Sequence, residues 1–419
     1  MNNNFSATKI YLFIEMAAST FFPMIFVASS LYRVTVAGLT PLQLVLVGTT
    51  LEISAFIFEI PTGIVADIYS RRLSVIIGYI LMGLGFMVEG FFPAFLPILL
   101  AQVIWGLGYT FTSGATQAWI SDEIGEDKAN KLFMRAARFG QYAALLGTGL
   151  AVLVGGENIA MPIRWGGMGV LLIGVILILT MPESGFKPTP REDRDTWGQM
   201  VHTFKEGIQA VHARPRLKTI LWIGLFYGLY SEGFDRLWVK HLIDSFELPA
   251  FFMGNQVAFF GVLRAIGTVL TIIAMRSMEK RIDTSQPQAI GRAMLIVTGL
   301  ISISLIGYAI SPLLLLTMGI FLLIMVLRRV AIPLYTSWVN QKLDSGTRAT
   351  VLSISSQVDA IGQIAGGPGV GLIAKLVSVV AAISTSGLFL TPALFLVGRA
   401  NAQSREQVEA ENETENPIY

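Results

Sequence analysis

The stretch that decides the fold is Gly-Ile-Val-Ala-Asp-Ile-Tyr-Ser-Arg-Arg at residues 63–72, which lies between two long apolar segments. Two arginines and an aspartate in a short turn at a membrane face are costly unless partners meet them there. Gly63 permits close backbone packing at the end of the preceding segment. We therefore expect Asp67, Arg71 and Arg72 to bond to neighbouring helix ends at one face of a membrane.

The composition is typical of an integral membrane protein. Of its 419 residues, 53% are hydrophobic and 14% are charged, against about 25% charged in a typical soluble domain. The mean hydropathy is +0.63. The chain has no Cys and only 3 scattered His, so we expect no disulfide, no metal site and no cofactor. A net charge of +2 makes nucleic acid an unexpected partner.

Apolar segments of about 20 residues recur along the chain and predict an all-α integral membrane protein with twelve transmembrane helices. The predicted spans are 9–31, 41–66, 73–92, 95–119, 133–155, 162–181, 218–242, 250–275, 289–309, 312–340, 351–373 and 376–398. A polar break after the sixth span gives four regions. They are an N-terminal six-helix bundle (1–181), a linker with an amphipathic helix (182–217), a C-terminal six-helix bundle (218–398) and an acidic disordered tail (399–419).

The distribution of Lys and Arg predicts the orientation. Placing the N-terminus in the cytoplasm puts most of the 30 Lys and Arg on the cytoplasmic side. On the opposite, outer side of the membrane it leaves Arg33, Arg164, Lys240 and Lys375. The positive-inside rule therefore predicts a multi-pass protein of a cell membrane, plasma or bacterial inner, with both termini cytoplasmic.

The spacing G-x-x-x-D-x-x-x-R-R after the second apolar segment resembles the loop 2–3 signature of the major facilitator superfamily of transporters. With the twelve predicted spans, the resemblance covers 9–398. Asp122 matches the acidic residue that closes the fourth span in that family. The resemblance implies two six-helix bundles that rock about a midplane site, with a cytoplasmic gating relay of Asp67, Arg71, Arg72 and Asp122 beside Gly63. We expect a monomer, a small-molecule substrate and protons as the coupling ion.

Two further motifs resemble one branch of that family. Residues 102–108, Gln-Val-Ile-Trp-Gly-Leu-Gly, are similar to the span 4 motif R-x-x-x-G-x-G, with Gln102 where the motif has Arg. The antiporter motif of span 5 is partly present, and a fuller version follows in span 11. Its glycines are Gly147, Gly149, Gly155 and Gly156 in span 5, and Gly362, Gly366, Gly367 and Gly369 in span 11. The chain thus resembles the twelve-span drug:proton antiporters, which implies export of lipophilic or cationic drugs by proton-coupled alternating access.

Ionisable residues inside the predicted spans are candidates for coupling, because such residues are expensive in lipid. Glu232 and Asp235 share a helix face, and two carboxylates so close favour proton binding by one of them. Asp235, Glu232 and Glu52 are the predicted proton carriers. The other intramembrane charges are Arg236, Arg264, Arg328, Arg329 and Asp359. Arg236 points about 100° away from Asp235, so we expect it to pair elsewhere, and Asp359 has Arg328 and Arg329 as alternative partners.

Aromatic residues gather on spans 1, 4, 7 and 10, which line the central cavity in the family that the chain resembles. The predicted cavity residues are Phe22, Trp105, Tyr109, Tyr227, Tyr230, Phe234, Tyr335 and Trp338. Such a set suits bulky cations or amphiphiles, which favours drug efflux. A proton-coupled or uncoupled carrier of a polar metabolite, such as a sugar or organic acid, is the alternative, and many polar side chains in the cavity would favour it. No G-x-x-x-x-G-K-[ST], H-E-x-x-H or G-x-S-x-G motif occurs, so we do not expect an enzyme.

Overall fold

The computed structural model describes residues 6–187, 205, 209, 211, 214–252, 254–283, 286–341 and 345–415, and this part of the chain is all-helical. It forms two compact units. The first unit comprises Met1–Thr196 and Glu247–Ala265, and the second comprises Trp197–Phe246 and Ile266–Tyr419. Most of the amphipathic helix predicted in the linker lies outside the described residues.

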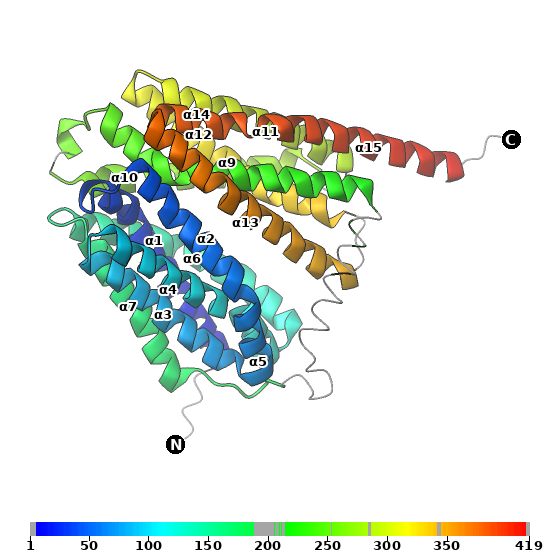
Figure 1. Ribbon diagram of the computed structural model, residues 1–419. Helices are drawn as coiled ribbons and strands as arrows, with labels where there is room; N and C mark the ends of the chain where they lie inside the picture. Colours follow the sequence, from blue (N-terminus) through cyan, green and yellow to red (C-terminus); the bar gives the residue numbers. More distant parts are fainter. Residues whose placement is uncertain are drawn as a thin grey trace. The chain divides into compact units, whose positions relative to one another are not determined.

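The first unit is a bundle of long helices (Figure 1). They are α1 (Ala7–Thr35), α2 (Pro41–Ile64), the short π-helix η1 (Val65–Tyr69), α3 (Arg71–Phe91), α4 (Phe95–Thr112), α5 (Ala115–Ile124), α6 (Glu126–Gly155) and α7 (Met161–Thr180). The turn Ser113–Gly114 divides the predicted span 95–119 into α4 and α5. The signature at 63–72 covers the end of α2, the whole of η1 and the start of α3, where the Ser70 side chain caps α3 by accepting from the Leu73 amide at 2.9 Å.

The second unit is also a helical bundle. Its helices are α9 (Pro215–Ser245), the later part of α10 (Gln256–Arg281), α11 (Pro287–Ile310), α12 (Leu314–Asn340), α13 (Ser345–Leu376), α14 (Val379–Leu388) and α15 (Thr391–Glu415). The prediction of a disordered tail over 399–419 is wrong as far as Glu415, because α15 continues through it. Residues 399–415 contain neither Gly nor Pro and are rich in Ala, Gln, Arg and Glu, which favour helix.

One boundary differs from the predicted domains. Residues Glu247–Ala265, which include the 3₁₀ turn η3 (Ala250–Phe252) and the start of α10, belong to the first unit and not to the C-terminal bundle. Their packing against α6 explains the difference, since the Asn255 Nδ2 donates to the Val152 carbonyl at 2.8 Å. Sequence spacing alone could not reveal a side-chain contact across a hundred residues.

In the second unit, α9 packs closely along α13, and glycines make the approach possible (Figure 1). A Cβ added at Gly228 would lie 2.0 Å from the Asp359 carbonyl oxygen, and one at Gly362 would lie 2.3 Å from the Leu225 carbonyl. Only residues without a side chain fit such contacts. The close approach brings the Asp359 region of α13 beside the polar part of α9.

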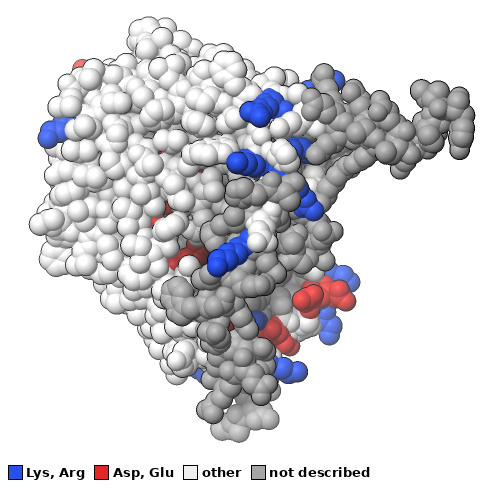
Figure 2. Space-filling model, turned by 45° about the vertical axis from the view of Figure 1, so that its right-hand side comes forward, with Lys and Arg blue, Asp and Glu red and all other residues white. Residues whose placement is uncertain are grey.

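Ten helical segments of the described chain are long and apolar enough to cross a membrane. Helices α9 and α13 are long enough as well, at 31 and 32 residues, but their charged and polar residues lower their hydropathy. Figure 2 shows a wide surface with very few charged side chains and a group of Lys and Arg gathered at one border. Both α9 and α13, together with α12, line the candidate site.

Candidate functional site

A cavity of about 570 Å³ opens within the second unit, between α9, α12 and α13. Eleven of the 16 residues that line it have polar or charged side chains, although apolar atoms make up the larger part of its surface. The lining residues are Gly224, Tyr227, Tyr230, Ser231 and Asp235 from α9, Arg328, Ala331, Ile332, Tyr335, Thr336 and Val339 from α12, and Leu352, Ser355, Ser356, Asp359 and Gln363 from α13. A cavity of this size suits a small organic solute.

Three tyrosines form one wall of this cavity. The Tyr227 ring meets the Tyr230 ring edge-on at a centroid distance of 5.6 Å and stacks on the Tyr335 ring at 6.4 Å. The Tyr227 hydroxyl bonds with the Thr298 hydroxyl at 2.7 Å, and the Tyr335 hydroxyl donates to the Ile220 carbonyl at 3.1 Å. These bonds fix the rings, so the wall presents flat faces in defined positions.

An ion pair joins α12 to α9 at the cavity. The Arg328 guanidinium binds both oxygens of the Asp235 carboxylate, with 2.7 Å between Nη2 and Oδ2 and a still closer contact between Nη1 and Oδ1. The guanidinium also lies over the rings of Tyr230 and Phe234, at 5.6 and 5.9 Å from their centroids. Bidentate pairing and ring contacts hold Arg328 in one orientation.

Asp359 is the second carboxylate of the cavity. Its Oδ2 accepts from the Gln363 Nε2 at 2.8 Å, one helical turn further along α13. The prediction offered Arg328 or Arg329 as its partner, but Arg328 pairs with Asp235, and Arg329 is exposed on α12. With Arg328 neutralised, ionised Asp359 leaves the lining with one excess negative charge.

Arg236 pairs with Glu232 and not with its neighbour Asp235, in agreement with the expectation that it pairs elsewhere. Its Nε donates to the Glu232 Oε1 at 2.8 Å, which makes an ion pair within α9. Residues four apart in a helix lie about 40° apart around its axis, so Arg236 faces Glu232 although it points away from Asp235. Glu232 is 1% exposed and does not line the cavity. The two carboxylates predicted to share a proton are each held by an arginine.

The structure separates the predicted aromatic cavity residues. Tyr227, Tyr230 and Tyr335 line the cavity, whereas Phe234 packs against Tyr308 and Phe321, and Trp338 is buried. Three further predicted cavity residues belong to the first unit. Phe22 and Trp105 pack in a cluster with Phe26 and Phe86, and Tyr109 is half exposed on α4. Glu52 and Arg264 also lie in the first unit, on α2 and α10.

The signature at 63–72 forms a second charged cluster, in the first unit. Arg71 makes a very close ion pair with Asp122 and lies 3.9 Å from Asp67, which is largely exposed. Arg72 does not join these carboxylates: its backbone amide donates to the Glu183 Oε1 at 2.9 Å and its Nη2 donates to the Ile178 carbonyl at 2.6 Å. Of the residues predicted to form a relay, Arg71 contacts Asp67 and Asp122, whereas Arg72 bonds to other groups.

Two acidic residues of this cluster were missed from sequence. Glu183 accepts from the Ser70 hydroxyl at 2.7 Å as well as from the Arg72 amide, and Glu123 accepts from the amides of Ser184 and Gly185 at 2.6 and 2.7 Å. The segment that follows α7 is thereby tied to α3 and α5. The position of Glu183, just after the predicted sixth span, could have indicated from sequence that it lies near the charged signature.

A third charged cluster, also missed, is buried in the first unit. Glu89 accepts from the Arg33 Nε and Nη2 at 2.8 and 2.9 Å and from the Gln102 Nε2 at 3.0 Å. Its side chain is fully buried. Gln102, which stands where the resembling motif has Arg, thus donates to a carboxylate whose charge Arg33 neutralises. The sequence feature that could have revealed this cluster is Glu89, the one acidic residue within the predicted span 73–92.

Comparison with known proteins identifies the family of this chain. A family model described as the Major Facilitator Superfamily matches residues 7–367. The chain belongs to the major facilitator superfamily. It is 26% identical over 368 residues to an uncharacterized MFS-type transporter, YxaM, of Bacillus subtilis (strain 168). The aligned region covers 85% of each chain.

Solved structures of this superfamily share the fold. The nucleoside transporter NupG matches with a TM-score of 0.72 at 13% identity, over 96% of this chain and 99% of that one. A POT family transporter in complex with 5-aminolevulinic acid matches with a TM-score of 0.71 at 11% identity, over 95% of this chain and 96% of that one. The predicted fold class is confirmed, and the protein is a multi-pass secondary transporter.

Proposed function

We propose that this major facilitator carries a polar organic solute with a planar group, and that proton movement drives its transport. The observation that carries this proposal is the lining of the cavity in the second unit. Tyrosine, serine and threonine hydroxyls, a glutamine amide and three charged groups surround about 570 Å³. Groups of this kind recognise a solute by directed hydrogen bonds, whereas promiscuous drug sites depend on apolar area.

The geometry disfavours the drug-export hypothesis that the aromatic count suggested. A lipophilic cation would need an open aromatic face, but the guanidinium of Arg328 already lies over Tyr230 and Phe234. Trp338, predicted to stack on such a substrate, is buried outside the cavity. The stacked pair of Tyr227 and Tyr335 suits a flat, uncharged ring or amide instead. A nucleoside, the cargo named for one structural neighbour, fits this description.

For the proton carrier we propose Asp359, ahead of Asp235, Glu232 and Glu52. Asp235 and Glu232 are each neutralised by an arginine in contact with them. Asp359 has an amide partner, and its charge remains in excess in a lining that faces the membrane interior. An uncompensated carboxylate at that depth is most stable when it binds a proton or a cationic group of the substrate.

The charged cluster of the first unit supplies a gate in this proposal. Arg71 and Asp122 would hold the ends of α3 and α5 together in one state of the transport cycle. Charge-assisted bonds of this type are strong enough to stabilise a closed state and can still be exchanged for water. Protonation at the second unit would have to be relayed to this gate by the rocking of the bundles.

Two measurements test the proposal. In the first, thermal unfolding of the purified protein is followed with uridine, dialanine, glutamate, ethidium and tetraphenylphosphonium. We expect stabilisation by one of the polar compounds and none by the two cations. Tyr335→Phe, which removes a hydroxyl that accepts from Ser355 at 3.2 Å, should weaken binding about 5- to 100-fold, the cost of a lost polar partner. Stabilisation by both cations and by no polar compound would contradict the proposal and favour drug export instead.

The second measurement uses proteoliposomes loaded with the compound found in the first. Asp359→Asn should abolish accumulation driven by a pH gradient and preserve exchange of labelled for unlabelled solute. Asp244→Asn, the same chemical change at an exposed pair with Lys240 in the same unit, serves as the matched control. If Asp359→Asn still concentrates the solute against its gradient, Asp359 is not the proton carrier.

A further inference from the structure

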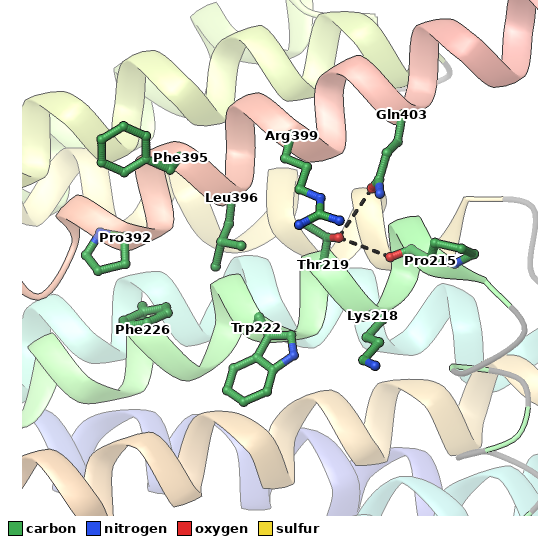
Figure 3. Close-up of a pocket in the computed structure, with 10 residues that line it drawn as sticks. All are labelled: Pro215, Lys218, Thr219, Trp222, Phe226, Pro392, Phe395, Leu396, Arg399 and Gln403. Atoms are coloured by element: carbon green, nitrogen blue, oxygen red, sulfur yellow. Dashed lines mark hydrogen bonds between the residues drawn. The ribbon is translucent and has the colours of Figure 1, made fainter.

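A groove of about 760 Å³ lies between α9 and α15, separate from the transport cavity. One end is apolar, with Trp222, Phe226, Pro392, Phe395 and Leu396, and the other end carries Lys218, Arg399 and Gln403 (Figure 3). Trp222 is 50% and Phe395 is 75% exposed. Large exposed aromatics beside exposed cations form the pattern of a surface that meets both acyl chains and headgroups.

The groove and the cavity use largely different faces of α9. At 3.6 residues per turn, the groove residues of α9 cluster around one direction, and the cavity residues point roughly 150° away from it. The cavity face is packed against α12 and α13, whereas the groove face looks onto α15. The groove and the transport cavity therefore share no lining residue.

The polar end of the groove is built from side chains on both helices. In Figure 3, Leu396, Arg399 and Gln403 point from α15 toward α9. The Thr219 hydroxyl lies 3.3 Å from the Gln403 Oε1 and 3.0 Å from the Pro215 carbonyl, which ties the two helices together there. Lys218 and Arg399 lie beside this link, and none of the described residues that line the groove is Asp or Glu. Among the side chains that the structure describes, neither cation has a carboxylate within ion-pair distance.

We propose that this groove is a binding site for one anionic phospholipid. Lys218 and Arg399 bind the phosphate of the headgroup, and an acyl chain lies along Trp222, Phe226, Phe395 and Leu396. The spacing fits, because Lys218 and Phe226 are separated by about 12 Å of helix, so the cations stand at one end of an apolar track. Both cations lie near the linker and the C-terminal helix, on the side that the positive-inside rule predicts to be cytoplasmic.

The test uses the full-length protein in phosphatidylcholine nanodiscs that contain increasing fractions of phosphatidylglycerol with brominated acyl chains. Bromine quenches tryptophan fluorescence on contact, and subtraction of the Trp222→Phe signal isolates Trp222. Each cation near the surface favours an anionic lipid about fivefold, so two give a preference of about 25-fold over brominated phosphatidylcholine at low salt. The preference should fall as salt is added.

The variants separate a built site from general surface charge. Lys218→Gln and Arg399→Gln should each reduce the preference about fivefold, and the double variant should nearly abolish it. Lys131→Gln with Arg135→Gln, which removes two exposed cations from α6 in the first unit, should leave it unchanged. Both groove residues are exposed, so their removal should spare the fold, and a charge-conserving Lys218→Arg variant should keep the preference.

Three results would overturn the proposal. Equal quenching by the two brominated lipids would show that the cations select nothing. A preference that survives in the Lys218→Gln, Arg399→Gln double variant would place the anionic lipid elsewhere. Displacement of brominated phosphatidylglycerol by millimolar glycerol 1-phosphate would show that the site recognises a free phosphate and not a lipid.

Discussion

The buried cluster of Arg33, Glu89 and Gln102 allows a stability prediction with a worked magnitude. Glu89→Ala removes an acceptor of three hydrogen bonds and leaves the Arg33 guanidinium, whose side chain is 9% exposed, without its counter-charge. Removing one partner of a buried ion pair costs about 3–5 kcal/mol. For a folding unit of this size, about 2–4 °C of melting temperature is lost per kcal/mol. We expect the melting temperature to fall by about 6–20 °C.

The assay is thermal unfolding of the purified protein in detergent, followed by tryptophan fluorescence. Glu157→Ala, at an exposed glutamate of the same unit, is the control and should change the free energy of unfolding by at most about 0.5 kcal/mol. Replacing both Arg33 and Glu89 by Met should recover most of the loss, because a buried pair can be exchanged for apolar side chains at little cost. A fall below about 2 °C for Glu89→Ala, or a double variant as unstable as the sum of the two single ones, would refute the reasoning.

Two further predictions concern the first unit. Because Arg71 contacts Asp122 far more closely than Asp67, Asp122→Asn should slow transport more than Asp67→Asn, with both variants folded; equal rates in a proteoliposome exchange assay would contradict this. A Cβ at Gly147 would lie 1.9 Å from a backbone carbonyl of α1, whereas one at Gly149 meets nothing within 4 Å. Gly147→Ala should therefore prevent accumulation of folded protein in membranes while Gly149→Ala permits it, as measured by size-exclusion chromatography of the extracted protein.

The sequence predicted the helices well, and the side-chain partners much less well. Hydropathy and length locate a membrane helix because lipid offers the backbone no hydrogen-bond partners, so each span must be apolar and helical by itself. The division of the predicted span 95–119 into α4 and α5 depended on local turn geometry, whereas the continuation of α15 agrees with the helix propensity of residues 399–415. The pair Glu232 and Arg236 was predictable from its four-residue spacing and was overlooked in favour of the neighbouring Asp235.

By itself, the sequence determined the class of protein, the twelve spans and the charged signature at 63–72, because these depend on local composition and on short-range spacing. Only the tertiary structure decided which charges meet. Arg328 lies 93 residues from Asp235, and Arg33 lies 56 residues from Glu89. Partners so far apart along the chain are chosen by how the helices pack, and glycines such as Gly228 set how closely they approach. The candidate substrate site, the excess charge at Asp359 and the groove beside Lys218 all follow from that packing.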